Sequence, residues 1–244
     1  MGEDLSPWVL AAISILPGLL WLWFFYREDP FEPEPKKLLL SFFGLGMLAV
    51  VPAFLIELPW RPSLLAGLRA GDPVRLAAFS FLLVEGVEEG VKTAVLFLAT
   101  RRLAEYDEPL DGIIYGVTVG LGFAALENWL YAAARGLTVG ILRAVVASLA
   151  HASFTGWLGY FVTLARFGGR RGAVFTGFTL SVLLHGAYDF ALLAGGGRSG
   201  LLALTLVAAA MLLLFKKMRD LTALSPFRPT GAKMYSGNSG KDRK

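Results

Sequence analysis

The chain of 244 residues contains no cysteine, and only 17% of its residues are charged. The lack of cysteine excludes disulfide frameworks, thiolate metal sites and cysteine nucleophiles. A soluble globular domain normally carries about a quarter charged residues, so this low charge beside 55% hydrophobic residues excludes an ordinary soluble enzyme. Any chemistry must be carried by His, Asp, Glu, Lys, Ser or Thr, and the chain has only two histidines.

Long apolar runs fill most of the chain. They lie at about 7–26, 37–58, 76–100, 112–134, 138–165, 172–194 and 199–215. As a helix, at ~1.5 Å per residue, each run is long enough to cross a ~30 Å hydrocarbon core. None shows the polar–apolar alternation of β-barrel strands. The sequence therefore predicts an all-α, polytopic membrane protein with about seven transmembrane helices in one domain, residues 1–215.

The distribution of basic residues predicts the orientation of these helices. The loops after the first, third and fifth runs and the C-terminal tail hold sixteen Lys and Arg, and the remaining loops hold five. Because cytoplasmic loops are enriched in Lys and Arg, we expect an N-out/C-in protein of the cytoplasmic membrane. The net charge of +4 is then explained by the lipid bilayer, and no nucleic-acid partner is expected. The stretch 57–73 is predicted to be an external connection, and the tail, 216–244, a basic, disordered cytosolic segment.

Several ionisable side chains lie inside the apolar runs, where each costs about 2.5–3.5 kcal/mol at the centre of a helix. In the third run Glu85, Glu88, Glu89 and Lys92 fall within an arc of roughly 100° on one helix face. We interpret them as a polar stripe that points into the bundle. Glu85 is predicted to be a supporting group or part of a cavity wall.

Three further runs contribute Glu127, His151 and the pair His185 and Asp189, which are four residues apart. In the predicted orientation, these residues and Glu89 of the third run lie between the membrane midplane and the outer boundary. One shared depth on four helices is what a single buried site requires. The alternatives are structural: interhelical hydrogen bonds, a Glu88–Lys92 ion pair, or an aspartate that fixes a packing histidine. Gly112, Gly116 and Gly120 are interpreted as a close-packing helix face.

The order of these residues resembles a known family. Glu88–Lys92 (EEGVK) fits an EExxK motif, Phe123–Glu127 (FAALE) fits FxxxE, His151 occupies the third-motif position, and His185–Asp189 (HGAYD) fits HxxxD. The sequence is similar to the PrsW family of intramembrane proteases, relatives of the CAAX-processing and bacteriocin-processing membrane proteases. The resemblance covers roughly residues 37–194. It implies cleavage of membrane-anchored substrates, with an anti-sigma factor as the best-known substrate type.

The related CAAX-type proteases carry EExxxR and FxxxH motifs, where this sequence has EExxK and Glu127. These differences place the chain nearer the PrsW branch. They leave open whether catalysis depends on a metal, because the wider superfamily has been described in both ways.

Peptide hydrolysis needs an activated water, stabilisation of an oxyanion and a proton for the leaving amine. In a metal-dependent version His151, His185 and Glu127 hold Zn²⁺ with an open position for water, and Asp189 orients His185 or is itself a ligand. Glu88 or Glu89 takes the proton from water, and Lys92 keeps the other carboxylate ionised.

In a metal-free version Glu89 and His151 activate water directly, and His185 stabilises the oxyanion.

A different class of function is also open, because a proton- or cation-coupled transporter also lines a cavity near the membrane midplane with buried carboxylates. A non-catalytic receptor or scaffold is the third reading.

Overall fold

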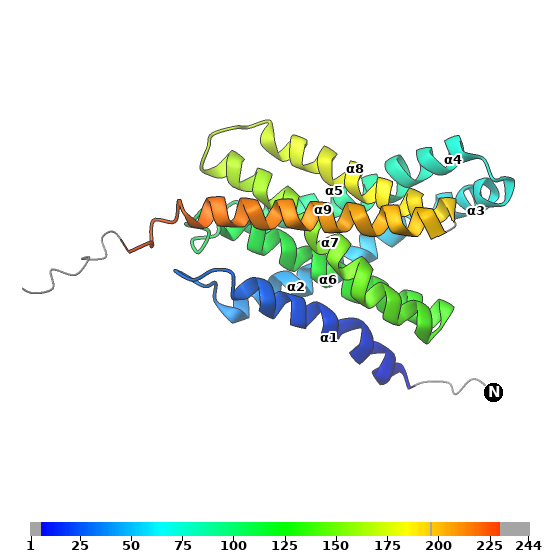
Figure 1. Ribbon diagram of the computed structural model, residues 1–244, viewed down its shortest axis with the longest axis horizontal. Coiled ribbons are helices and arrows are strands. Elements are labelled where there is room, and N and C mark those ends of the chain that lie inside the picture. The colour runs from blue at the N-terminus through cyan, green and yellow to red at the C-terminus, as the bar shows by residue number, and fades with distance from the viewer. Residues whose placement is uncertain (1–5, 196, 230–244) are drawn as a thin grey trace, which may run out of the picture.

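The computed structural model describes residues 6–195 and 197–229, and these form a bundle of nine α-helices without a β-strand (Figure 1). The α-helices are α1 (Pro7–Tyr26), α2 (Lys36–Glu57), α3 (Arg61–Ala70), α4 (Pro73–Ala78), α5 (Glu85–Thr100), α6 (Asp111–Arg135), α7 (Leu137–Arg166), α8 (Ala173–Ala194) and α9 (Gly197–Thr222). A 3-10 turn, η1 (Leu58–Trp60), precedes α3, and a π-helical segment, η2 (Phe79–Val84), joins α4 to α5. The all-α prediction is confirmed.

Five helical stretches of the described chain are long and apolar enough to cross a membrane. They are Trp8–Tyr26, Lys36–Gly67, Asp111–Arg135, Leu137–Arg166 and Gly197–Thr222. The other two predicted spans, 76–100 and 172–194, are helical too, as α4–η2–α5 and as α8. They are less apolar because they contain the ionisable residues of the third and sixth runs. The multi-pass architecture is confirmed, and the count of seven crossings stays a prediction.

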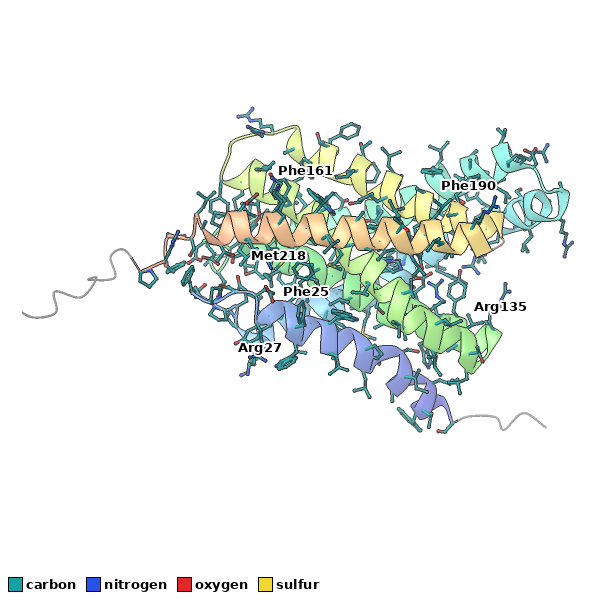
Figure 2. The ribbon with its side chains drawn as sticks, in the orientation of Figure 1. Phe25, Arg27, Arg135, Phe161, Phe190 and Met218 are labelled. Atoms are coloured by element: carbon teal, nitrogen blue, oxygen red, sulfur yellow. The ribbon has the colours of Figure 1, made fainter. Side chains whose placement is uncertain are left out.

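The loops are divided between the two ends of the bundle. Arg27, after α1, and Arg135, at the end of α6, lie at opposite ends (Figure 2). Helix α1 begins at the end that carries α3 and α4, whereas α9 finishes at the other end (Figure 1). This placement of the two ends of the described chain is compatible with an odd number of crossings. Which side faces the cytoplasm stays a prediction.

The predicted domain boundary at residue 215 lies inside α9. The helix continues to Thr222, and Met218 and Leu221 are buried along this extension. Met218 belongs to the same buried cluster as Phe25 of α1, and Figure 2 labels both side chains. Residues 230–244, which form most of the predicted tail, lie outside the described residues.

Helix α6 lies at the centre of the bundle and packs against α1, α2 and α7. Its residues from 111 to 125 are all buried. A Cβ added to Gly112, Gly116 or Gly120 would collide with atoms of α7, because the backbones of the two helices are in close contact there. Small residues permit such approaches between membrane helices. The predicted close-packing glycine face is therefore present, and it presses α6 against the helix that carries His151.

Replacing Gly120 by alanine is expected to destabilise the protein. The new methyl group would meet the carbonyl group of His151, with the carbonyl carbon at 2.9 Å, and Thr155 Cβ at 3.1 Å. Overpacking of this kind typically costs about 1–3 kcal/mol, so Gly120→Ala should melt at a lower temperature in detergent. Gly44→Ala is the matched control, since a Cβ there meets no described atom within 4 Å. Equal melting of the two variants would contradict the tight α6–α7 contact.

Candidate functional site

The polar face of α5 lies in the interior of the bundle. Glu85, Glu88, Glu89 and Lys92 are all buried, and the Lys92 side chain is completely enclosed. Spacings of three and four residues place them on one side of the helix. Their hydrogen bonds reach across to the histidine of α7 and the histidine of α8. The stripe expected from the sequence thus faces its neighbouring helices.

Lys92 connects three of the site residues. Its Nζ donates to Glu88 Oε2 at 3.2 Å, to Glu89 Oε1 at 2.8 Å and to His151 Nδ1 at 3.0 Å. It also lies 3.9 Å from the centroid of the Phe123 ring, in a cation–π contact. An ammonium group has three donor hydrogens, and here each has an acceptor. Lys92 therefore fixes two carboxylates and one imidazole, while they offset the cost of burying its charge.

His151, on α7, lies between Lys92 and Glu127. Because an ammonium group only donates, Nδ1 of His151 accepts from Lys92, and Nε2 carries the proton. Nε2 donates to Glu127 Oε2 at 2.9 Å. The same carboxylate oxygen lies 2.8 Å from the guanidinium of Arg143, whose plane lies over the ring of Tyr131. Glu127 therefore holds the imidazole in one orientation and is itself held by an arginine.

Arg143 is a site residue to which the sequence assigned no role. It lies on α7, in the fifth apolar run, and is largely buried beside Glu127 of α6. An arginine inside a membrane helix needs a partner, and that was the available signal. Its partner could not be identified, because no periodicity relates two positions on different helices.

His185, on α8, is held mainly by Glu89. Its Nδ1 donates to Glu89 Oε1 at 2.9 Å, whereas Glu85 Oε2 and Glu88 Oε2 lie farther away, at 3.5 and 3.9 Å. The ring stands edge-on to that of His151, with centroids 4.7 Å apart. Since Nδ1 donates its proton to Glu89, the lone pair of the neutral imidazole is on Nε2.

Asp189 was expected to orient His185 from one turn away or to be a metal ligand itself. Within the described chain no hydrogen bond joins the two, and Glu89 makes the orienting bond instead. Asp189 is half-buried. One of its carboxylate oxygens lies within 4.8 Å of a carboxylate oxygen of Glu85 and a ring nitrogen of His185, and these three atoms could act as metal ligands. It therefore lies at the edge of the site, beside Glu85.

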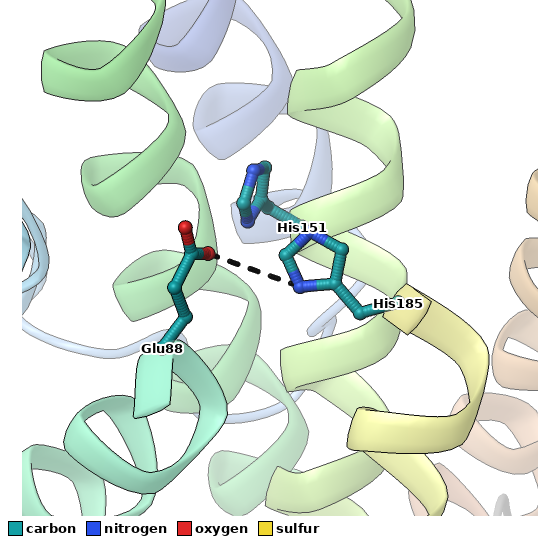
Figure 3. Close-up of side chains that lie close together, drawn as sticks. All are labelled: Glu88, His151 and His185. Atoms are coloured by element: carbon teal, nitrogen blue, oxygen red, sulfur yellow. Dashed lines mark ion pairs between the residues drawn. The ribbon is translucent and has the colours of Figure 1, made fainter. Parts of the chain in front are cut away.

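Glu88, His151 and His185 bring donor atoms together from α5, α7 and α8 (Figure 3). One carboxylate oxygen and one ring nitrogen from each histidine lie within 4.8 Å of one another. Two imidazoles and a carboxylate form a donor set that catalytic zinc sites use. Glu127, the carboxylate expected in this set, instead contacts the ring of His151 through Nε2.

The surroundings of this donor set also suit a divalent cation. Each histidine gives one ring N–H to a carboxylate, Glu89 for His185 and Glu127 for His151, as metal-binding histidines commonly do. Acidic groups outnumber permanent cations around the set. The five carboxyl groups are those of Glu85, Glu88, Glu89, Glu127 and Asp189, and the two cations are Lys92 and Arg143. The residues present therefore fit a bound metal in both chemistry and charge.

Comparison with known proteins identifies the family. The family described as PrsW family intramembrane metalloprotease matches residues 34–215. Protease PrsW of Geobacillus kaustophilus is 37% identical over 207 residues, covering 83% of this chain and 89% of the relative. Protease PrsW of Clostridioides difficile is 32% identical over 249 residues, covering 98% of this chain and 99% of the relative. The Bacillus subtilis relative of the same name is 34% identical, covering 76% of this chain and 83% of the relative. No solved structure matches the chain.

Proposed function

The chain belongs to the PrsW family of intramembrane metalloproteases, and from this premise we propose that it cleaves membrane-anchored proteins at the Glu88–His151–His185 site. The observation that carries the proposal is the meeting of two imidazoles and a carboxylate from three helices, with donor atoms within 4.8 Å. All three residues are buried in helical segments, away from the loops at either end.

Glu88, His151 and His185 are the residues that would hold a divalent metal, and Zn²⁺ suits this mixed nitrogen and oxygen set best. When bound, such a metal polarises the scissile carbonyl and acidifies a water molecule. Glu89 and Glu127 orient the two imidazoles through their N–H groups. His151 offers Nδ1, whose lone pair accepts a hydrogen bond from Lys92, and this atom could hold the metal only if that hydrogen bond were given up.

Glu89 is proposed to accept the proton from water and to pass it to the leaving amine. Its Oε1 is engaged by Lys92 and His185. Its Oε2 is buried and has no hydrogen-bond partner among the described residues. A carboxylate with one anchored oxygen and one free oxygen is positioned to move a proton without losing its orientation. Lys92 keeps the carboxylate ionised by remaining beside it.

The proposed substrate is a protein anchored in the cytoplasmic membrane, of the anti-sigma-factor type that the family resemblance implies. The site residues lie on helices of a multi-pass bundle, so a peptide bond must enter the membrane region to reach them. A substrate with its own membrane anchor is already confined to that region. A soluble protein would first have to transfer a segment of polar backbone out of water, at a cost of several kcal/mol for each unsatisfied group.

Chelation tests this function directly. Purified protein in liposomes, with a tagged single-span reporter, should cleave the reporter, stop cleaving it after treatment with 1,10-phenanthroline, and recover on addition of Zn²⁺. The His185→Ala variant should remain inactive at every zinc concentration, because it lacks one of the two imidazoles. Full activity of metal-free protein would contradict the metal and leave water activation by glutamate and histidine. Proton-coupled transport without cleavage would favour a transporter.

A further inference from the structure

A second group of buried acidic residues lies outside the site described above. Asp29 and Glu34 belong to the loop between α1 and α2, Glu108 to the loop between α5 and α6, and Asp111 to the first turn of α6. All four are at least nine-tenths buried, with 4%, 2%, 1% and 0% exposed. The group lies at the end of the bundle where α9 finishes (Figure 1). None of these residues takes part in the proposed proteolysis.

Each of three carboxylates uses one oxygen in a hydrogen bond within the protein, and two of them hold the backbone of the adjoining loop. Asp29 Oδ1 accepts from the backbone N–H groups of Phe31 and Glu32, at 3.2 and 3.3 Å. Asp111 Oδ2 accepts from the backbone of Asp107 and Glu108, at 3.1 and 2.8 Å.

Glu108 Oε2 accepts from the hydroxyl of Ser225, which follows α9. These bonds fix the orientation of the three side chains within the loops. The Glu108–Ser225 bond joins the α5–α6 loop to the segment after α9, and Asp29 of the α1–α2 loop lies beside Glu108 and Asp111.

The second oxygen of each carboxylate has no hydrogen-bond partner among the described residues. These atoms are Asp29 Oδ2, Glu108 Oε1 and Asp111 Oδ1. Buried polar atoms are nearly always satisfied, because each unpaired one costs about 1–3 kcal/mol. So many free oxygen atoms in one place therefore indicate a missing ligand.

No positive side chain of the described residues forms an ion pair with these acids. Further acidic groups, Glu32 and Asp107, lie near enough to repel them. The negative charge of the group must be neutralised by protons or by a cation.

The spacing of the oxygens favours a cation. Asp29, Glu108 and Asp111 each offer a carboxylate oxygen, and the three atoms lie within 4.8 Å of one another. Oxygen-only donor sets suit hard cations of the Ca²⁺, Mg²⁺ and Mn²⁺ class, at 2.0–2.6 Å from each ligand. We propose that Asp29, Glu108 and Asp111 bind a hard divalent cation, which ties the α1–α2 loop, the α5–α6 loop and the end of α9 together.

The test compares two aspartate variants that differ in burial. Asp29→Asn keeps one side-chain oxygen for the loop N–H groups and removes the charge. Asp72→Asn is the matched control, because Asp72 also accepts from two backbone N–H groups, at 3.0 and 3.1 Å, but is only partly buried and caps α4 at the opposite end of the bundle (Figure 1). The protein in detergent is first treated with EDTA, and zinc is then restored. The melting temperature of this zinc-loaded protein is measured without added cation and during titration with Ca²⁺, Mg²⁺ or Mn²⁺.

At least one cation should raise the melting temperature of the wild type by about 5–10 °C at a hundredfold excess over its Kd. Asp72→Asn should respond equally, while Asp29→Asn should require at least tenfold more cation. Without added cation, Asp29→Asn should melt at or above the wild type, because it lacks one uncompensated buried charge. A merely structural aspartate would instead make the variant less stable in every buffer.

Glu108→Gln provides a second test if Asp29→Asn does not fold, since glutamine can still accept from Ser225. An equal response of the two aspartate variants to the cation would overturn the proposal. A wild type that is stabilised by acid but by none of the three cations would also overturn it and indicate shared protons instead.

Discussion

Glu89→Gln is expected to lower turnover by about 10²–10⁴-fold, the usual contribution of a positioned proton-transfer group, without loss of bound metal. Glutamine keeps Oε1, which accepts from Lys92 and His185. An amide nitrogen then takes the place of the free Oε2, and this group cannot accept a proton. kcat and kcat/KM should therefore fall together, because the lost interaction belongs to the transition state.

Glu85→Gln is the control for this variant. Glu85 lies on the same face of α5, is equally buried, and has an oxygen 3.5 Å from His185 Nδ1, yet Glu85 makes no hydrogen bond with Lys92 among the described residues. The same change of size and charge at Glu85 should cost far less activity. Wild-type turnover by Glu89→Gln would indicate that Glu88 is the proton acceptor. Wild-type turnover by both Glu88→Gln and Glu89→Gln would indicate that the carboxylates of α5 take no part in the reaction.

The positions of the long helices could be predicted because hydropathy is a local property. The first run, 7–26, coincides with α1, and the run 172–194 differs from α8 by one residue. The end of α9 was placed too early because Lys216 and Lys217 interrupt the apolar run. Helix packing continues past them, and Met218 and Leu221 are buried on the inner face.

The partners within the site could be predicted only in part. Depth along a helix follows from counting residues at ~1.5 Å each, and it correctly grouped the ionisable residues of four helices. The rotation of each helix about its own axis is set by packing, such as the glycine contacts between α6 and α7. That rotation brings Glu88 rather than Glu127 beside both histidines, and Glu89 rather than Asp189 to His185 Nδ1.

The acidic group of Asp29, Glu108 and Asp111 gave no periodic signal in the sequence. Its members lie in two loops and at a helix start, where neither hydropathy nor helical spacing constrains the side chains. The available clue was composition, because acidic residues cluster in both loops that join long apolar runs at one end. Only the fold reveals that these loops meet and that the carboxylates are buried.

Glu88→Gln is expected to remove most of the bound metal, whereas Glu127→Gln should retain it. Glu88 shares a donor set with His151 and His185 within 4.8 Å, and an amide oxygen is a much weaker zinc ligand than a carboxylate. Glu127 contacts His151 through the ring N–H, so its replacement should weaken metal affinity by only about 10–100-fold, as for other groups that orient a ligand.

Metal content of the purified variants, measured by mass spectrometry at equal protein concentration, separates these roles. Wild type and Glu89→Gln should carry one zinc ion per chain, Glu88→Gln and His185→Ala almost no zinc, and Glu127→Gln an amount of zinc that rises to the wild-type level when excess Zn²⁺ is supplied. Rescue by zinc is decisive. A higher zinc concentration restores metal binding more readily when only an orienting hydrogen bond is lost than when a metal ligand is lost. If Glu127→Gln alone lost the metal beyond rescue, Glu127 would be the third ligand, as the sequence first indicated, and Glu88 would become the proton acceptor. If an active wild type carried no metal at all, Glu88, Glu89 and the two histidines would have to activate water by themselves.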